Sequence, residues 1–243
     1  MKTLTTLAAC VVVLAATSVA SATIIIDNFN SGDQSLSVRQ AAPNSSSLVW
    51  GLLEADVLGG TREVLLPWIG GASRTFADVN LDDNGTLDYA QGPGTESRLT
   101  IIWEREQSPD QIGLSDYNLG VDLTAQGDTG FVANLLNIDL PIKFRIEVYT
   151  DASNASYWET VGAGGDTGAK YVPFAAFSTL SGGGADFTNV GAIKLVIDGT
   201  GYPDTDVSID YFATGVPEPS TLALAGVALF GAVFMARRRR WRS

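Results

Sequence analysis

Short apolar runs separated by turn residues make up the central part of the chain. Stretches rich in Ile, Val, Phe, Tyr, Thr and Trp recur between clusters of Gly, Asn, Asp and Ser, and no helical period extends beyond two turns. This punctuation is typical of all-β sandwiches and barrels, whose strands are short and reverse at turns. The pattern predicts about ten strands, at 23–29, 47–53, 61–66, 75–79, 86–89, 98–103, 142–148, 157–161, 192–197 and 207–213.

The segment 142–148 gives the clearest strand signal. Apolar residues alternate strictly with Lys143, Arg145 and Glu147, so one face of this strand is expected in the core and the other in water. Gly-rich segments at 162–168 and 181–184 predict chain reversals, and loops of this kind also form binding rims.

The N-terminus has the pattern of a cleavable secretion signal. Lys2 precedes an uncharged apolar stretch, which closes on the small residues of Ala20-Ser21-Ala22. A signal peptidase is therefore expected to cut before Thr23. Two alternatives are weaker: a lipobox ending at Cys10 would cut the apolar region short, and an uncleaved membrane anchor would not explain the cleavage site.

The C-terminus combines an extended tripeptide, an apolar run and a basic cluster. Pro217 and Pro219 keep Glu218 out of any helix. The apolar run 221–236 would span about 24 Å as a helix, slightly less than a ~30 Å hydrocarbon core. Four consecutive arginines follow and would stay on the cytoplasmic side of a membrane: Arg237, Arg238, Arg239 and Arg240.

Together these tail features resemble the PEP-CTERM sorting signal of exosortase substrates, found in Gram-negative bacteria that produce exopolysaccharide. The resemblance covers 216–243 and implies recognition of Pro217, Glu218 and Pro219 by an exosortase, then delivery to the envelope or matrix. An ordinary membrane anchor is the alternative, and a GPI signal fits worse because its tail would not end in arginines. The expected plan is a signal peptide at 1–22, a β-sandwich at 23–215 and a sorting tail with one transmembrane helix.

Charge and missing residue types exclude several functions for the domain 23–215. It contains 26 acidic and 9 basic residues, a net charge of −17, which disfavours nucleic acid as a partner. The chain has no histidine, and its one cysteine lies in the signal. Disulfides, imidazole or thiolate metal sites, and Ser-His-Asp or Cys-His catalysis are therefore not available.

Oxygen ligands leave a calcium site open. One structural calcium between the first and last strands could use Asp27, Asp33, Asp206 and Asp210. The segment 80–88 matches the first nine positions of an EF-hand loop, but its twelfth position is Gln91 rather than Glu. Because Asn84-Gly85 is a strong hairpin signal, a hairpin is the preferred interpretation of this segment.

The domain also resembles galactose-binding-like jelly-roll modules found among carbohydrate-binding domains. The residues behind this resemblance are Ile26-Asp27-Asn28-Phe29, Trp158, Val172-Pro173-Phe174, the segments 185–190 and 193–198, and Ile209-Asp210-Tyr211-Phe212. Aromatic side chains can stack on sugar rings, although core packing is their commoner use. Trp158 and its neighbour Tyr157 are the best candidates for a ligand rim.

These observations favour a non-enzymatic exported protein associated with surface polysaccharide. The alternative is a carbohydrate-binding module with a defined glycan ligand. A secreted hydrolase is a third hypothesis, with Glu104 and Glu106 or Asp204 and Asp206 as candidate carboxylates. Residues two apart on a strand share a face and do not flank a substrate, which disfavours glycosidase chemistry.

Overall fold

A computed structural model of the chain describes residues 23–105 and 112–216. The predicted signal peptide, the Pro217-Glu218-Pro219 motif, the apolar run 221–236, the arginine cluster and Glu106 lie outside the described residues. Within the described residues, no helix is both long enough and apolar enough to cross a membrane.

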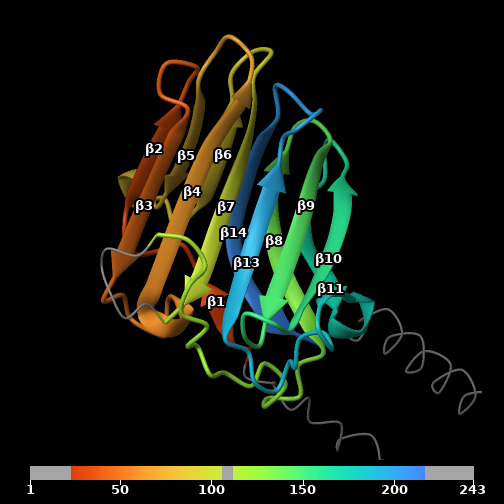
Figure 1. Cartoon of the computed structure of the whole chain (residues 1–243). Helices are drawn as coiled ribbons and strands as arrows, with labels where there is room; N and C mark the ends of the chain where they lie inside the picture. The colour runs from red at the N-terminus through yellow and green to blue at the C-terminus, as the bar shows by residue number, and fades with distance from the viewer. Residues whose placement is uncertain (1–22, 106–111, 217–243) are drawn as a thin grey trace, which may run out of the picture.

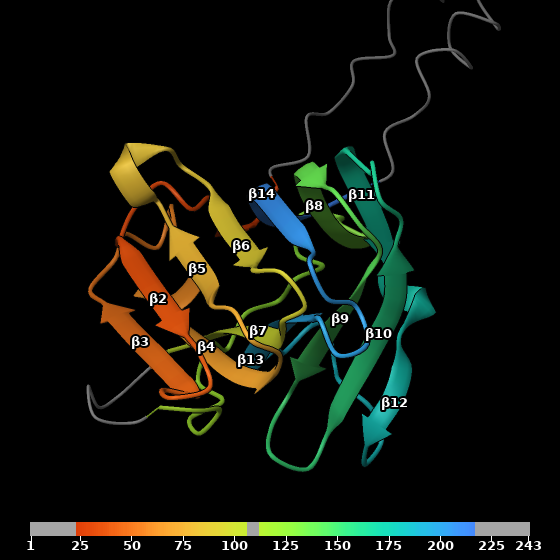
Figure 2. The same ribbon diagram turned by 90° about the horizontal axis from the view of Figure 1, so that it is seen from above.

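Two antiparallel sheets pack face to face and enclose one core (Figures 1 and 2). Sheet A has the order β11-β8-β14-β6-β5-β2, with β1 also paired to β14. Its strands are β1 (Ile25–Asp27), β2 (Gln34–Val38), β5 (Thr75–Val79), β6 (Leu87–Gln91), β8 (Gly130–Ile138), β11 (Gly168–Pro173) and β14 (Asp206–Gly215).

Sheet C has the order β12-β10-β9-β13-β7-β4-β3. Its strands are β3 (Asn44–Trp50), β4 (Thr61–Gly70), β7 (Glu96–Glu104), β9 (Ile142–Tyr149), β10 (Ala155–Gly162), β12 (Ser178–Ser181) and β13 (Ala192–Asp198). Three short 3₁₀ turns complete the elements: η1 (Leu58–Gly60), η2 (Leu81–Asp83) and η3 (Phe174–Ala176). The predicted all-β sandwich is confirmed.

All ten predicted strands are present, with ends shifted by a few residues. Four further strands, β2, β8, β11 and β12, escaped prediction. β2 has only Leu36 and Val38 as apolar residues, and β12 lies at the edge of its sheet and buries little. β8 lies between β11 and β14 and lacks regular alternation. Its place between two partners, rather than its own pattern, defines it as a strand.

The core is built from the inward-facing residues of both sheets. Trp103 on β7 packs against Phe212 on β14, with ring centroids 5.5 Å apart, and Phe212 stacks on Phe131 of β8 at 5.2 Å. The buried apolar residues of the described chain run from Ile26 to Ala213. The described residues of both sheets therefore share one hydrophobic core.

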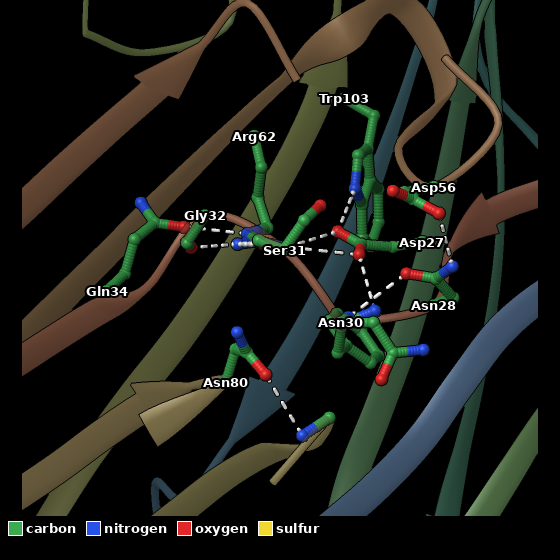
Figure 3. A network of polar contacts seen from close by, with 12 residues as sticks. Asp27, Asn28, Asn30, Ser31, Gly32, Gln34, Asp56, Arg62, Asn80 and Trp103 are labelled. Atoms are coloured by element: carbon green, nitrogen blue, oxygen red, sulfur yellow. Dashed lines mark hydrogen bonds and ion pairs between the residues drawn. The ribbon is translucent and has the colours of Figure 1, made fainter. Parts of the chain in front are cut away.

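A buried polar network beside β1 connects the two sheets (Figure 3). Arg62 on β4 donates to both carboxylate oxygens of Asp27 on β1, at 3.0 and 3.1 Å, and to Oε1 of Gln34 on β2 at 2.7 Å. Asp27 also accepts from Trp103 Nε1 and from the amide of Phe29, each at 2.9 Å. Neither Asp27 nor Arg62 is exposed to solvent.

The segment 80–88 connects β5 to β6, which pair from Thr75↔Gln91 to Val79↔Leu87. The hairpin interpretation is therefore confirmed, although the connection is longer than a two-residue Asn-Gly turn. Asn80, Asp82 and Asp83 adopt left-handed backbone conformations within it, and Asn80 caps the loop by accepting from the amide of Gly85 at 3.0 Å.

Candidate functional site

The outer face of sheet C carries a cluster of aromatic and charged side chains. On β9 and β10, Phe144, Ile146 and Trp158 face the interior, so their neighbours in the alternation face outward. The strand register places Tyr157 opposite Glu147, and Glu147 opposite Lys194 of β13. We call the following residues the outer-face cluster: Tyr117, Arg145, Glu147, Tyr149, Tyr157, Glu159 and Lys194.

Glu147 is the centre of this cluster. Its carboxylate lies 2.6 Å from Nε of Arg145 and 3.0 Å from Nζ of Lys194, and it accepts a hydrogen bond from the Tyr149 hydroxyl at 2.5 Å. Arg145 also lies 3.6 Å from a carboxylate oxygen of Glu159. One carboxylate therefore fixes the positions of three side chains from two neighbouring strands.

Aromatic rings flank these charges. The guanidinium of Arg145 lies over the ring of Tyr157, 4.5 Å from its centroid, which is a cation–π geometry. The ring of Tyr149 lies 5.7 Å from that of Tyr117. All three tyrosines are half-buried, so each keeps part of its ring open to solvent.

The surroundings keep Glu147 ionised and Tyr149 protonated. Burial raises the pKa of Glu147, but hydrogen bonds from Tyr149 and Lys194, with the charges of Lys194 and Arg145, outweigh it and leave that pKa lowered. Burial and the Glu147 carboxylate raise the pKa of Tyr149. Burial, then Glu104 and Asp151, raise the pKa of Tyr117. A carboxyl that stays ionised accepts hydrogen bonds and cannot act as a general acid at neutral pH.

A loop at 112–118 borders the cluster and is fixed by a buried glutamate. Glu104, at the end of β7, accepts hydrogen bonds from the amides of Ser115, Asp116 and Tyr117 at 3.0 to 3.2 Å. Because Glu104 is only 2% exposed, this loop is held from beneath. Sequence analysis gave Glu104 as half of a candidate acid pair. In the structure its carboxylate accepts from the amide of Tyr117 and so positions that residue.

Trp158 lies on the opposite face of β10 from Tyr157. It lines an apolar pocket of about 350 Å³ between the sheets, together with Phe131, Phe144 and Tyr171. Adjacent strand residues point to opposite faces, so the two residues predicted to form one ligand rim belong to two different surfaces. Tyr157 joins the outer-face cluster and Trp158 does not.

Three of the four predicted calcium ligands use their carboxylates in other contacts. Asp27 pairs with Arg62, Asp33 accepts from Asn80 Nδ2 at 2.7 Å, and Asp210 accepts from Asn134 Nδ2 at 2.9 Å. The backbone amide of Asp206 donates to Asp139 Oδ1 at 2.6 Å. No group of three or more potential ligands could hold a metal ion in residues 23–105 and 112–216. The four carboxylates are therefore not gathered into one ligand group in the described residues, and a structural calcium stays a prediction.

Asp204 and Asp206, the second candidate acid pair, have different surroundings. Asp204 accepts from the amide of Gly94, and burial and the Asp139 carboxylate raise the pKa of Asp206. Both residues lie at or just before the start of β14, where Asp206 pairs with Ala90 of β6 in sheet A, and therefore away from the outer-face cluster.

Sequence analysis missed most of the outer-face cluster. The alternation in 142–148 placed Arg145 and Glu147 on the exposed face of a strand, and this was the available signal. Lys194 and Tyr117 join them only because β13 pairs with β9 and the 112–118 loop folds back over β7. Neither arrangement is visible in the local sequence.

Comparison with protein families finds the PEP-CTERM protein-sorting motif at residues 215–240. The motif indicates export to the cell envelope or surface and implies processing by an exosortase. The predicted resemblance of the tail to PEP-CTERM sorting signals is therefore confirmed. No curated protein matches the chain.

Similar folds occur among solved carbohydrate-binding modules. A family 11 module of the cellulosomal cellulase Lic26A-Cel5E of Clostridium thermocellum has 10% identity and a TM-score of 0.38, covering 82% of this chain and 96% of its own. The solution structure of CtCBM11 has 10% identity and a TM-score of 0.40, with 82% and 98% covered. TmCBM61, solved with β-1,4-galactotriose, has 11% identity and a TM-score of 0.29, with 77% and 90% covered.

Proposed function

We propose that this chain is a non-enzymatic envelope or matrix protein of a Gram-negative bacterium, and that its β-sandwich binds a glycan at the outer-face cluster. The observation that carries the proposal is the preformed arrangement of three half-buried tyrosines around the Arg145–Glu147–Lys194 network. The proposed association with surface polysaccharide agrees with the destination that the sorting motif indicates.

The chemistry of the cluster suits a sugar. A pyranose ring presents an apolar face that can lie on a tyrosine, while its hydroxyl groups can both donate and accept hydrogen bonds. Glu147 and Glu159 supply acceptors, Arg145 and Lys194 supply donors, and the tyrosine hydroxyls can do both. Ion pairs already hold these groups in place, so little conformational entropy is lost on binding.

The charge of the cluster favours a neutral glycan. Arg145 and Lys194 are balanced by Glu147 and Glu159 at the site itself, and the surrounding domain has a net charge of −17. A polyanionic chain would be repelled at long range and would find no uncompensated cation in the cluster.

A glycan array on the fragment 23–216 tests this function. We expect binding to one or more neutral glycans, and the variant Tyr157→Ala should weaken it about two- to tenfold, since loss of an aromatic contact costs about 0.5 to 1.5 kcal/mol. The matched control is Phe76→Ala, which removes an exposed aromatic ring from sheet A. An array without any binding, or equal affinity in both variants, would refute the proposed site.

The same preparation tests the absence of catalysis. Bound oligosaccharides incubated with the fragment should be recovered at their original length by mass spectrometry. Shorter products that disappear in a Glu147→Gln or Glu159→Gln variant would instead assign a hydrolase.

A further inference from the structure

A second hollow lies where the two ends of the described chain meet. It has a volume of about 440 Å³ and is lined by residues of β8, β11 and β14, including Tyr171 and Tyr211, and by Thr23, Asp128 and Val216. It is separate from the outer-face cluster, because β11, β8 and β14 belong to sheet A.

Asp128 is the unusual residue of this hollow. It is 3% exposed, and its Oδ2 accepts a hydrogen bond from the hydroxyl of Thr214. Its Oδ1 is also buried, and it has no hydrogen-bond partner among the described residues. A buried carboxylate oxygen without a donor is costly, so a donor group is expected to complete this site.

The start of the mature domain is attached to the same threonine. The amide of Ile24 donates to Thr214 Oγ1 at 3.1 Å, and the amide of Thr214 donates to the carbonyl of Ile24 at 2.9 Å. Thr23 directly precedes Ile24, and their Cα atoms are about 3.8 Å apart. Thr23 lines the hollow together with Asp128. Thr23, with its backbone nitrogen, therefore lies at the same hollow as the Asp128 carboxylate, and Thr214 contacts both Ile24 and Asp128.

Hydrolysis of the Ala22–Thr23 peptide bond would turn that nitrogen into an α-ammonium group. A secondary amide offers one hydrogen, whereas an ammonium group offers three donors and a positive charge. An α-amine has an ordinary pKa of about 7.7 to 8.0, so it is mostly charged at neutral pH.

We propose that Asp128 is the binding site for the α-ammonium group of Thr23, so that signal cleavage supplies the missing donor and locks β1 onto β14. The inference rests on the predicted cleavage between Ala22 and Thr23 and is independent of glycan binding. The unprocessed chain lacks the group that completes the site, and the processed chain gains an ion pair at the junction of its two ends.

A thermodynamic cycle tests the proposed ion pair between Asp128 and the α-ammonium group of Thr23. The fragment 23–216 is prepared with Thr23 as its first residue, and again with the natural Ser21 and Ala22 retained, which moves the amine by two residues. Asp128→Asn should lower the Tm of the Thr23-first protein by about 3 to 6 °C and change that of the extended protein much less. Asp122→Asn is the control, because Asp122 accepts from Thr124 and does not line the hollow.

Titration of the α-amine provides a second readout that needs no destabilised variant. In the Thr23-first protein its pKa, followed by NMR, should lie above the ordinary range, because the carboxylate favours the charged form. Tyr171 and Tyr211 are the other titratable side chains lining the hollow, and Phe variants of both should retain the raised pKa.

Three results would overturn the proposal. The first is an equal Tm loss for Asp128→Asn in both N-terminal forms, which would give Asp128 a role independent of the amine. The second is an α-amine pKa within the ordinary range. The third is an exported protein whose first residue, by N-terminal sequencing, is not Thr23.

Discussion

Arg62 is a cation without solvent exposure, and five acceptors surround its guanidinium group. Besides Asp27 and Gln34 it donates to the carbonyl oxygens of Ser31 and Gly32. Burial raises the pKa of the Asp27 carboxyl, and the charge of Arg62 with the donors Trp103 and Phe29 offsets part of that effect. Removal of the cation would therefore leave a buried carboxylate without its main partner.

We predict that Arg62→Met lowers the unfolding free energy by about 3 to 5 kcal/mol. The stability of the variant should fall as the pH rises above about 4, because the unfolded Asp27 ionises there while the buried carboxyl, whose pKa burial raises without the Arg62 charge to offset it, holds its proton. Urea denaturation at several pH values measures both effects. The double variant Asp27→Asn/Arg62→Met should recover part of the stability at pH 7; no recovery would show that lost packing, not charge, dominates.

At the scale of elements, residues 115–117 of the loop depend on one side chain of the strand before it, Glu104. Three consecutive amides of the loop point at the Glu104 carboxylate, and the loop carries Tyr117 to the edge of the outer-face cluster. Because irregular segments have no ladder of their own, a buried acceptor of this kind determines their position.

We predict that Glu104→Ala frees this loop while the sheets remain intact. Hydrogen exchange of the amides at 115–117 should accelerate at least about tenfold, since loss of hydrogen bonds to a charged group costs about 1.5 to 3 kcal/mol. Glu96→Ala, at the other end of β7, is the matched control and should leave these amides unchanged. Equal exchange in both variants would contradict the assigned role of Glu104.

At the scale of the whole molecule, the C-terminal sorting motif indicates export of the chain to the cell envelope or surface. Replacing Pro217, Glu218 and Pro219 by alanine leaves the apolar run 221–236 and the arginines unchanged. We predict that this variant accumulates as an unprocessed membrane form, detected by its higher mass in immunoblots of an exosortase-bearing host. Processing and delivery like those of the unaltered chain would contradict recognition of the tripeptide.

Serine at Arg237, Arg238, Arg239 and Arg240 tests a different property of the tail. These residues are expected to hold the apolar run at the cytoplasmic face. Their loss should misplace or release the chain, whereas the tripeptide remains available. The two variants should therefore differ in fractionation.

The sequence by itself determined the features that depend on local chemistry. Alternation in 142–148, turn residues between apolar runs and the ordered tail motif are each readable within a few residues, because side-chain direction and turn geometry are local properties. They were enough for an all-β sandwich, ten of its strands and the sorting motif.

Only the tertiary structure decided which distant residues share a surface. Tyr117, Arg145 and Lys194 come from three segments that β-pairing and one loop bring together. Sequence analysis gave Asp27 as a candidate calcium ligand. In the structure both of its carboxylate oxygens accept hydrogen bonds from Arg62, 35 positions away. The physical reason is that strand pairing is a non-local choice made by the whole core, so charge partners cannot be read from spacing along the chain.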